Sequence, residues 1–232
     1  MKRTLLLAIG LCLLVSSCAI PARDTVFQTS IMNASATGGH NGEMTCHELR
    51  RHGNFGIGTF DHLGGEMVLL KGKVYQIEAD GRIRRMNPSD KVPLATVCQF
   101  KADRTVVIRR RSDYEEVKIL VNENAPHKNL FYAIKITGQF KSIHTRSGPA
   151  REETNSPSSK AGSNQPEFRM NRVSGTIVGF LLPSDVKGAN EPEYHLHFLS
   201  SDRTQGGHVL SFEITDGKCE IDALDRESPE GE

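Results

Sequence analysis

The chain has 232 residues, of which 37% are hydrophobic and 25% charged, a composition that is ordinary for a globular protein with a sizeable buried core. Its 29 Lys and Arg residues nearly balance 28 Asp and Glu residues, and the formal net charge of +1 argues against a basic protein that binds nucleic acid or an anionic membrane surface. We therefore expect a small molecule or another protein as the partner, and no nucleic acid.

Residues 1–18 have the layout of a secretory signal peptide. Lys2 and Arg3 precede an apolar run from Leu5 to Val15, which is shorter than the roughly 20 residues that a membrane-spanning helix requires. The run ends in VSSC, which looks like a bacterial lipobox and predicts lipidation of Cys18, whereas plain cleavage after Ala19 is the alternative. Either route predicts an extracytoplasmic protein whose only membrane attachment is an N-terminal lipid anchor, in the periplasm or at the cell surface.

Three cysteines follow this segment, at Cys46, Cys98 and Cys219. Their odd number and wide spacing match neither a disulfide framework nor a CxxC zinc module. A single disulfide is open to them in an oxidising compartment, and the sequence does not specify the pair.

The first half of the chain predicts a tether with a first strand over residues 19–43 and an N-terminal α/β lobe over residues 44–146. Thr45 to Glu48 has the form of a capping box and predicts a short helix that stops at Gly53. A second capping box, Ser112 to Glu115, predicts a helix that runs to about Val121.

Tight hairpins are predicted where a pair of residues supplies the positive φ that such turns require. Lys71-Gly72 and Asp80-Gly81 are such pairs, and each lies between strand-like runs. The segment FYAIKITGQFKSIHTR returns to strands around Thr137-Gly138.

Residues 147–165 are rich in Ser, Pro, Gly and charge, which predicts an exposed linker loop. Residues 166–232 then predict a C-terminal antiparallel lobe from four strand-like runs, VSGTIVGFLLP, YHLHFLSS, HVLSFEI and CEIDAL, the last two joined through Asp216-Gly217. The fold class is therefore expected to be α+β, with two β-sheet lobes: a mixed N-terminal sheet with short helices and an antiparallel C-terminal sheet.

Three of the nine histidines fall in the segment YHLHFLSSDRTQGGHVL. In a strand, side chains alternate between faces, so His195 and His197 point to one face while Tyr194, Leu196 and Phe198 point to the other. Antiparallel return of the chain would bring His208 near the first face, and Gly206-Gly207 would let the backbone approach closely.

Three convergent imidazoles suit a divalent transition ion, most often zinc, and leave a coordination position open for water or substrate. An exposed amphipathic strand is the alternative for a lone His-x-His pair. The Gly-Gly-His at the distance of a return strand favours the metal site. Surface or helix-capping roles are expected for the remaining histidines: His40, His47, His52, His62, His127 and His144.

Several stretches together resemble the α-acetolactate decarboxylase family, in order and at plausible spacing from about Leu49 to Glu213. They are GNFGIGTFDHLGGEMVLLKGKVYQ, NLFYAIKITGQFKSIHTR, VSGTIVGFLLP and YHLHFLSSDRTQGGHVL. The resemblance implies a zinc-dependent decarboxylation of 2-acetolactate to acetoin and carbon dioxide, two β-sheet lobes with the zinc site between them, and a homodimer.

Carried over residue by residue, the resemblance implies that His195, His197 and His208 bind Zn²⁺. It places Glu66 beside the metal as a general acid or proton relay, Arg146 on the charged group of the substrate, and Thr59 in the lining of the substrate pocket. Loss of carbon dioxide leaves electrons that become an enediolate, and zinc as a Lewis acid would hold that charge.

The sequence also departs from the family. Its loop at residues 147–165 is rich in Ser and Pro, Glu193 stands where a glycine is expected, and the chain ends soon after His208. In relatives a glutamate from the C-terminal tail approaches the metal; Glu227, Glu230 and Glu232 lie in the short tail of this chain. These departures motivate an alternative function: a non-catalytic lipoprotein that keeps the fold and binds metal or a small ligand. A third possibility is a related enzyme that acts on a bulkier 2-hydroxy-2-methyl-3-ketoacid.

Overall fold

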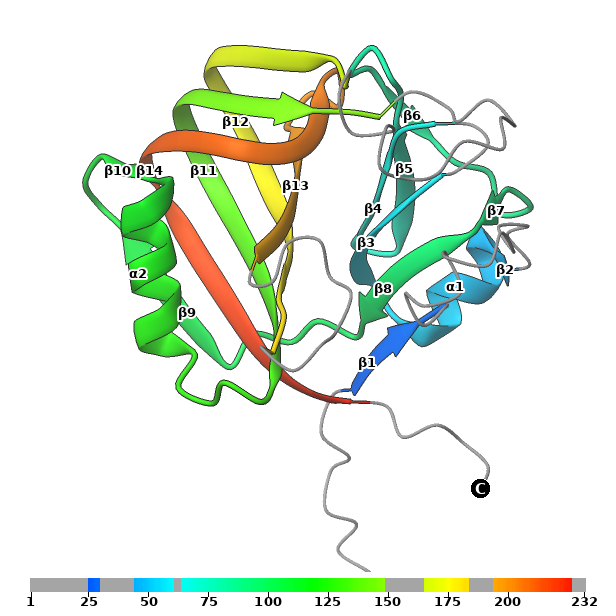
Figure 1. Cartoon of the computed structure of the whole chain (residues 1–232), viewed down its shortest axis with the longest axis horizontal. Coiled ribbons are helices and arrows are strands. Elements are labelled where there is room, and N and C mark those ends of the chain that lie inside the picture. The colour runs from blue at the N-terminus through cyan, green and yellow to red at the C-terminus, as the bar shows by residue number, and fades with distance from the viewer. Residues whose placement is uncertain (1–24, 30–43, 61–63, 149–164, 184–193, 227–232) are drawn as a thin grey trace, which may run out of the picture.

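The computed structural model describes residues 25–29, 44–60, 64–148, 165–183 and 194–226, and strands dominate these ranges (Figure 1). Two helices occur within them, α1 (Cys46–His52) and α2 (Tyr114–Asn124). The strands are β1 (Thr25–Gln28), β2 (Met44–Thr45), β3 (Phe55–Thr59), β4 (Glu66–Leu70), β5 (Lys73–Ile77), β6 (Ile83–Arg85), β7 (Lys91–Val92), β8 (Leu94–Cys98), β9 (Arg104–Ile108), β10 (Ser112–Asp113), β11 (Phe131–Arg146), β12 (Glu167–Leu181), β13 (Tyr194–Ser200) and β14 (Gly206–Arg226).

Several sequence predictions lie outside the described residues. They are the signal peptide with Cys18, most of the tether, residues 149–164 of the expected linker loop, and the tail glutamates Glu227, Glu230 and Glu232. Within the described ranges, no helix combines the length and the apolar character that crossing a bilayer demands.

Twelve of the described strands are hydrogen-bonded into one sheet, in the order β11-β12-β13-β14-β1-β8-β3-β4-β5-β6, with β9 and β10 added to β14. Because β11 pairs with β14 as well as with β12, strands β11 to β14 close into a ring. Figure 1 shows this ring on the left, with α2 outside it, and β3, β4, β5 and β8 on the right. Strands β2 and β7 form a separate small pair.

The direction of the pairings differs from the expected mixed N-terminal sheet. Every recorded pairing among β1, β3, β4, β5, β6 and β8 is antiparallel. The parallel pairing joins β1 to β14 and so connects the N-terminal strands to the C-terminal ones. Strands β9 to β11, expected in the N-terminal lobe, are hydrogen-bonded to β14.

Strand β14 is one strand of 21 residues, so the turn predicted at Asp216-Gly217 is wrong. Gly217 lies opposite Gly138 of β11, which in turn lies opposite Gly175 of β12. A Cβ atom on Gly217 would lie 2.5 Å from the Thr137 carbonyl oxygen, and one on Gly138 would lie 2.3 Å from the Asp216 carbonyl oxygen. The glycines are needed because the strand backbones approach closely here, and not because the chain reverses.

The two hairpin predictions at Lys71-Gly72 and Asp80-Gly81 are confirmed. Lys71 and Gly72 have φ values of 51° and 69° between β4 and β5. Gly81 has a φ of 81° between β5 and β6. Positive φ at these positions turns the chain tightly between the paired strands.

Both helices begin at capping boxes, one at the predicted residue and one shifted by a residue. Thr45 caps α1 and exchanges hydrogen bonds with Glu48, as predicted. Helix α2 is capped by Asp113 and Glu116 instead of Ser112 and Glu115. Ser112 instead begins the short strand β10, where it pairs with Ile214 of β14.

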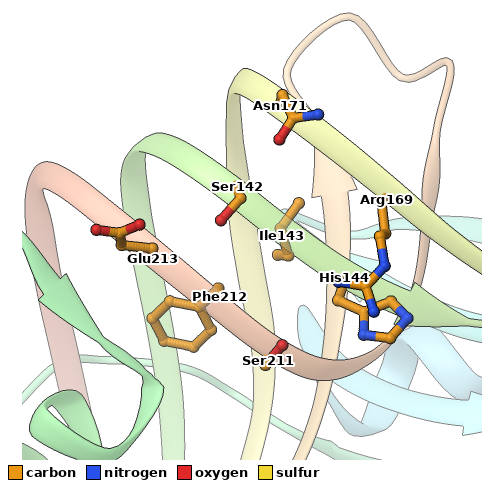
Figure 2. A pocket seen from close by; sticks show the side chains of 8 residues that line it. All are labelled: Ser142, Ile143, His144, Arg169, Asn171, Ser211, Phe212 and Glu213. Atoms are coloured by element: carbon orange, nitrogen blue, oxygen red, sulfur yellow. The ribbon is translucent and has the colours of Figure 1, made fainter.

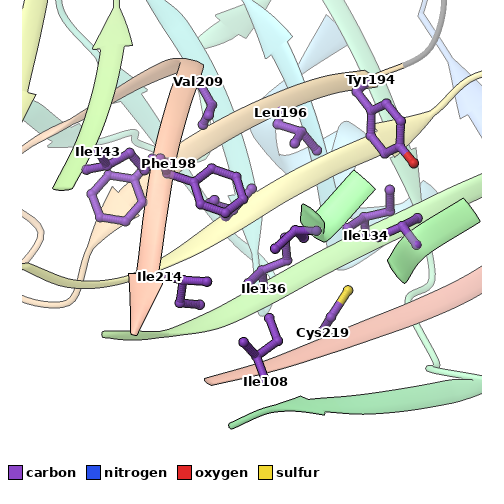
Figure 3. Close-up of a cluster of buried hydrophobic side chains, with 14 of the residues drawn as sticks. Ile108, Ile134, Ile136, Ile143, Tyr194, Leu196, Phe198, Val209, Ile214 and Cys219 are labelled. Atoms are coloured by element: carbon purple, nitrogen blue, oxygen red, sulfur yellow. The ribbon is translucent and has the colours of Figure 1, made fainter. Parts of the chain in front are cut away.

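The largest hydrophobic cluster fills the ring of β11 to β14 and the face covered by α2 (Figure 3). Strand β13 contributes Tyr194, Leu196 and Phe198 to it, at alternate positions. This confirms the alternation predicted for YHLHF, and it leaves His195 and His197 on the opposite face of the strand.

Cys46, Cys98 and Cys219 are buried thiols that form no disulfide with one another. Burial raises the pKa of Cys46 to about 11 and that of Cys219 to about 12. These two thiols are therefore protonated at neutral pH and are poor metal ligands and nucleophiles.

Candidate active site

Three histidines of β13 and β14 converge on one point. Their ligand nitrogens all lie within 4.8 Å of one another. His197 pairs directly with His208 across the two strands, and the Nε2 atoms of His195 and His197 are 3.1 Å apart. The predicted cluster is therefore present, with His197 and His208 buried and His195 partly exposed.

His208 can approach His195 and His197 because the two residues before it, Gly206 and Gly207, have no side chain. Gly207 has a φ of 151°, and a Cβ atom there would lie 2.7 Å from the Arg146 carbonyl oxygen. A Cβ atom on Gly206 would lie 2.4 Å from the Phe198 carbonyl oxygen. The glycine pair thus permits the close backbone approach that the sequence predicted.

The loop between β13 and β14 is held by its own polar side chains. The Ser200 hydroxyl donates to the Asp202 carboxylate at 2.6 Å and accepts from the backbone N–H groups of Thr204 and Gln205 at 3.1 Å. Such local bonds define the return of the chain, and with it the register that places His208 opposite His197.

All three imidazoles are kept neutral, which is the form that binds a metal ion. Burial, followed by the neighbouring histidines and Arg146, lowers the pKa of His195 to about 3 and that of His208 to about 2. Burial lowers the pKa of His197 to about 4, against a hydrogen bond to Met67 that acts in the opposite direction.

The ring of His197 is oriented by the backbone of β4. Its Nδ1 atom lies 3.0 Å from the Met67 carbonyl oxygen, which can only accept, so Nδ1 carries the proton. The Nε2 atom is then left with a lone pair that faces His195 and His208. A carbonyl partner of this kind is typical behind a histidine that binds metal.

Glu66 lies at the edge of the histidine cluster. Its Oε2 atom is 3.4 Å from Nε2 of His197, and its side chain is 15% exposed. Burial raises the pKa of Glu66 to about 7, while Arg146 and a hydrogen bond from the Gly148 backbone N–H act to lower it. A carboxyl group with such a pKa can both donate and accept a proton near neutral pH.

Arg146 stands among these groups. It is the last residue of β11, where it pairs with His208 on one side and with Glu167 on the other. Its charge lowers the pKa of Glu66 and of all three histidines, so the guanidinium lies within electrostatic reach of the whole cluster. The structure therefore brings Glu66 and Arg146 together with the three histidines.

Thr59 is placed by its pairing with Glu66. The two residues are directly opposite on β3 and β4, so their side chains point to the same face of the sheet. Thr59 is partly buried there.

No sequence pattern predicted several groups that complete the site. Ser147 and Gly148 stand at the start of the expected linker loop, yet Ser147 is fully buried and the Gly148 N–H bonds to Glu66. The Met67 carbonyl oxygen is a backbone atom, which no residue pattern reveals.

Of the other histidines within the described ranges, none joins this cluster. His144 pairs with Glu167 at 2.8 Å, and His52 stacks on Phe27 with ring centroids 3.6 Å apart. His144 also lines a separate hollow of about 180 Å³, with Ser142, Ile143, Arg169, Asn171, Ser211, Phe212 and Glu213 (Figure 2). That hollow lies over the paired strands β11, β12 and β14, and it contains none of the three clustered histidines.

Comparison of the amino-acid sequence with known proteins identifies a family. The family model for alpha-acetolactate decarboxylase matches residues 26–229. The alpha-acetolactate decarboxylase of Methanosarcina mazei is 40% identical over 201 residues, which cover 87% of this chain and 70% of that protein. That of Lactococcus lactis subsp. lactis is 38% identical over 201 residues, which cover 87% of this chain and 85% of that protein.

Solved structures agree with the sequence matches. The alpha-acetolactate decarboxylase of Bacillus subtilis strain 168 superposes with a TM-score of 0.81 at 33% identity, covering 89% of this chain and 90% of that chain. A Staphylococcus aureus protein described as similar to alpha-acetolactate decarboxylase superposes with a TM-score of 0.81 at 32% identity, with 87% of each chain covered. The chain belongs to the alpha-acetolactate decarboxylase family.

Proposed function

We propose that this protein decarboxylates 2-acetolactate to acetoin and carbon dioxide, with a divalent ion, zinc, held by His195, His197 and His208. The observation that carries the proposal is the meeting of three neutral imidazoles with one carboxyl and one guanidinium group. Family membership supplies the substrate. In this proposal the site lies where β13 and β14 of one β-sheet lobe face β4 of the other.

The residues fit a metal ion on chemical grounds. Three nitrogen donors within 4.8 Å of one another are all uncharged at neutral pH, and His197 has its second nitrogen satisfied by the Met67 carbonyl oxygen. Such a set suits zinc and leaves coordination positions for the substrate. A bound zinc ion would act as a Lewis acid for the negative charge that develops as carbon dioxide leaves.

The side chains around the cluster have complementary tasks in this reaction. Arg146 binds the carboxylate of the substrate, for which a guanidinium offers two parallel N–H donors. Glu66, with a pKa raised to about 7, delivers the proton that the product carbon requires. Thr59, opposite Glu66 on β3, lines the same face and contacts the substrate.

A direct assay tests the proposal. Protein loaded with zinc is expected to form acetoin from 2-acetolactate well above the spontaneous rate, and a chelator is expected to remove the activity until zinc is restored. His197→Ala is expected to lose the activity and the metal together. An active His197→Ala variant, or wild-type protein that produces no acetoin when loaded with metal, would refute the proposal.

A non-catalytic binding lipoprotein is the less favoured function. It would need the metal ligands but not an acid of tuned pKa beside them. Glu66 has such a pKa, and Arg146 acts on the same cluster. Turnover by the wild-type protein that disappears in Glu66→Gln would exclude this alternative.

We further propose that the protein is exported, lipidated at Cys18 and assembled as a homodimer. The support is the VSSC sequence after the apolar run and the family resemblance. Mass spectrometry of the N-terminal peptide from membrane fractions of wild-type cells and of cells with Cys18→Ala tests the lipid anchor. Analytical ultracentrifugation of the protein without residues 1–18 tests the dimer.

A further inference from the structure

Arg146 is flanked by two hydroxyl side chains that are completely buried. Thr145 and Ser147 both have 0% exposure. They flank Arg146 in an extended segment, so they point away from the face that Arg146 presents to the cluster. The Thr145 hydroxyl is hydrogen-bonded to the backbone of β14, and the Ser147 hydroxyl to the backbone of β5.

Ser147 is hydrogen-bonded to β5, the strand that pairs with β4 at Glu66. Its hydroxyl donates to the Ile77 carbonyl oxygen at 3.1 Å, and Ile77 is the direct pairing partner of Glu66. Its backbone N–H donates to the Pro166 carbonyl oxygen at 3.1 Å. The next residue, Gly148, then directs its own N–H at the Glu66 carboxyl group.

Thr145 is hydrogen-bonded to the start of β14, the strand that carries His208. Its hydroxyl donates to the Gly206 carbonyl oxygen at 3.3 Å, two residues before His208. A Cβ atom on Gly207 would lie 2.7 Å from the Thr145 Cβ atom, so the Thr145 side chain packs directly on the glycine that precedes His208.

We propose that Thr145 and Ser147 are positioning residues, which lock the end of β11 between β5 and β14 and so fix the distances from Arg146 and Gly148 to Glu66 and His208. This inference deepens the proposed function and rests on it. A displacement of a catalytic group by about 1 Å can lower the rate on the order of a hundredfold. Loss of either of these two hydrogen bonds is therefore expected to change the activity or the metal affinity of the site.

The positioning role of Ser147 is tested with Ser147→Ala and a matched control. Ser112 is also a buried serine whose hydroxyl donates to a backbone carbonyl oxygen, that of Arg110 at 3.3 Å, but it lies beside α2. We expect Ser147→Ala to lower kcat roughly ten- to a hundredfold at unchanged zinc content, and Ser112→Ala to keep the wild-type kcat. We also expect faster hydrogen exchange at the Gly148 amide, measured by NMR, in Ser147→Ala and not in Ser112→Ala.

The positioning role of Thr145 is tested by measuring the affinity of its variants for zinc. Thr145→Val keeps the shape of the side chain and removes the hydroxyl, whereas Thr145→Ser keeps the hydroxyl. Competition with a chromophoric chelator is expected to show weaker zinc binding by roughly tenfold in Thr145→Val and near-wild-type binding in Thr145→Ser.

The outcomes separate this inference from the proposed function. If the wild-type protein makes no acetoin, the proposed function fails, while amide exchange and zinc affinity still decide the positioning roles. If Ser147→Ala matches Ser112→Ala in kcat and in Gly148 exchange, and Thr145→Val binds zinc as the wild type does, the positioning roles are refuted.

Discussion

The carboxyl group of Glu66 lies beside the histidine cluster, where its side chain is only 15% exposed. Burial raises its pKa to about 7, and Arg146 and the Gly148 N–H limit the rise. At its ordinary pKa the group would be almost fully ionised at neutral pH and could not donate. The role of proton donor that we propose for Glu66 depends on this setting, which an ordinary surface glutamate at the start of a strand lacks.

Glu66→Gln is expected to lower kcat by about a hundredfold or more while the zinc content stays at the wild-type level, because the amide keeps the shape but carries no transferable acidic proton. The measurement is acetoin formation with parallel metal analysis. Glu115→Gln is the matched control, since Glu115 is an exposed residue of α2 that bonds only to Lys118 among the recorded contacts. Equal rates for the two variants would remove Glu66 from the reaction.

The three histidines make the metal-free protein sensitive to acid. Their pKa values of about 2 to 4 lie below the ordinary 6.5, so between about pH 4.5 and 6.5 the unfolded chain binds up to three more protons here than the folded chain. Glu66 acts in the opposite sense, since its raised pKa lets the folded chain keep one proton that the unfolded chain has released. The unfolded chain still binds more protons overall, so the free energy of unfolding rises with pH across this window.

Urea denaturation in the presence of a chelator checks this expectation. The free energy of unfolding should be lower at pH 5 than at pH 6.5. In His195→Gln, which removes one of the titrating imidazoles, the dependence on pH should be shallower. A free energy that falls with rising pH in the wild-type protein would contradict the assignment of three neutral, buried imidazoles.

Among the strands, the start of β14 positions His208 against His197. Gly206 and Gly207 bring the strand close to β13 and β11, and the loop bonded by Ser200 sets where it begins. Strand alternation on β13 could be predicted from the sequence, because Tyr194, Leu196 and Phe198 recur at every second residue. The pairing of β11 with β14, which brings Arg146 opposite His208, could not, because strands far apart in the sequence carry no mark of their partners.

Gly207→Ala tests this close approach. The new methyl group would meet the Arg146 carbonyl oxygen and Thr145, so we expect His208 to shift, with loss of zinc binding and a lower free energy of unfolding. Gly72→Ala is the matched control, because Gly72 also has a positive φ but has nothing within 4 Å of an added Cβ atom. It should cost only about 1 kcal/mol and leave zinc binding intact. Similar effects on zinc affinity in both variants would contradict the role assigned to the glycine pair.

Across the fold, hydrogen bonds join the region of the three histidines to the N-terminal strands. The His197 ring is hydrogen-bonded to the Met67 carbonyl oxygen of β4, and the Ser147 hydroxyl donates to the Ile77 carbonyl oxygen of β5. The Gly206 N–H donates to the Gly81 carbonyl oxygen at 3.1 Å. The metal ion that we propose for β13 and β14 would thereby be coupled to the packing of β4 and β5 against them.

Zinc is therefore expected to stabilise the whole fold. At free zinc a hundredfold above its dissociation constant, binding to the folded state alone adds about 2.7 kcal/mol to the free energy of unfolding. Thermal unfolding with zinc and with a chelator measures the shift in Tm. His195→Gln should reduce the shift strongly, and it is the gentler test because His195 is partly exposed. A shift of equal size in that variant would place the stabilising ion elsewhere.

The local features of this protein follow from its amino-acid sequence alone: the hairpins at Lys71-Gly72 and Asp80-Gly81, the helix capped by Thr45, and the two faces of β13. These depend on backbone preferences and side-chain alternation within a few residues. The family resemblance added Glu66 and Arg146 as partners of the histidines. The packing of Gly138 and Gly217 within long strands, and the contacts of Thr145, Ser147 and Gly148 around the site, became visible only in the folded structure. Those outcomes depend on which backbones meet across the sheet, and strand pairing over more than sixty residues leaves no local pattern in the chain.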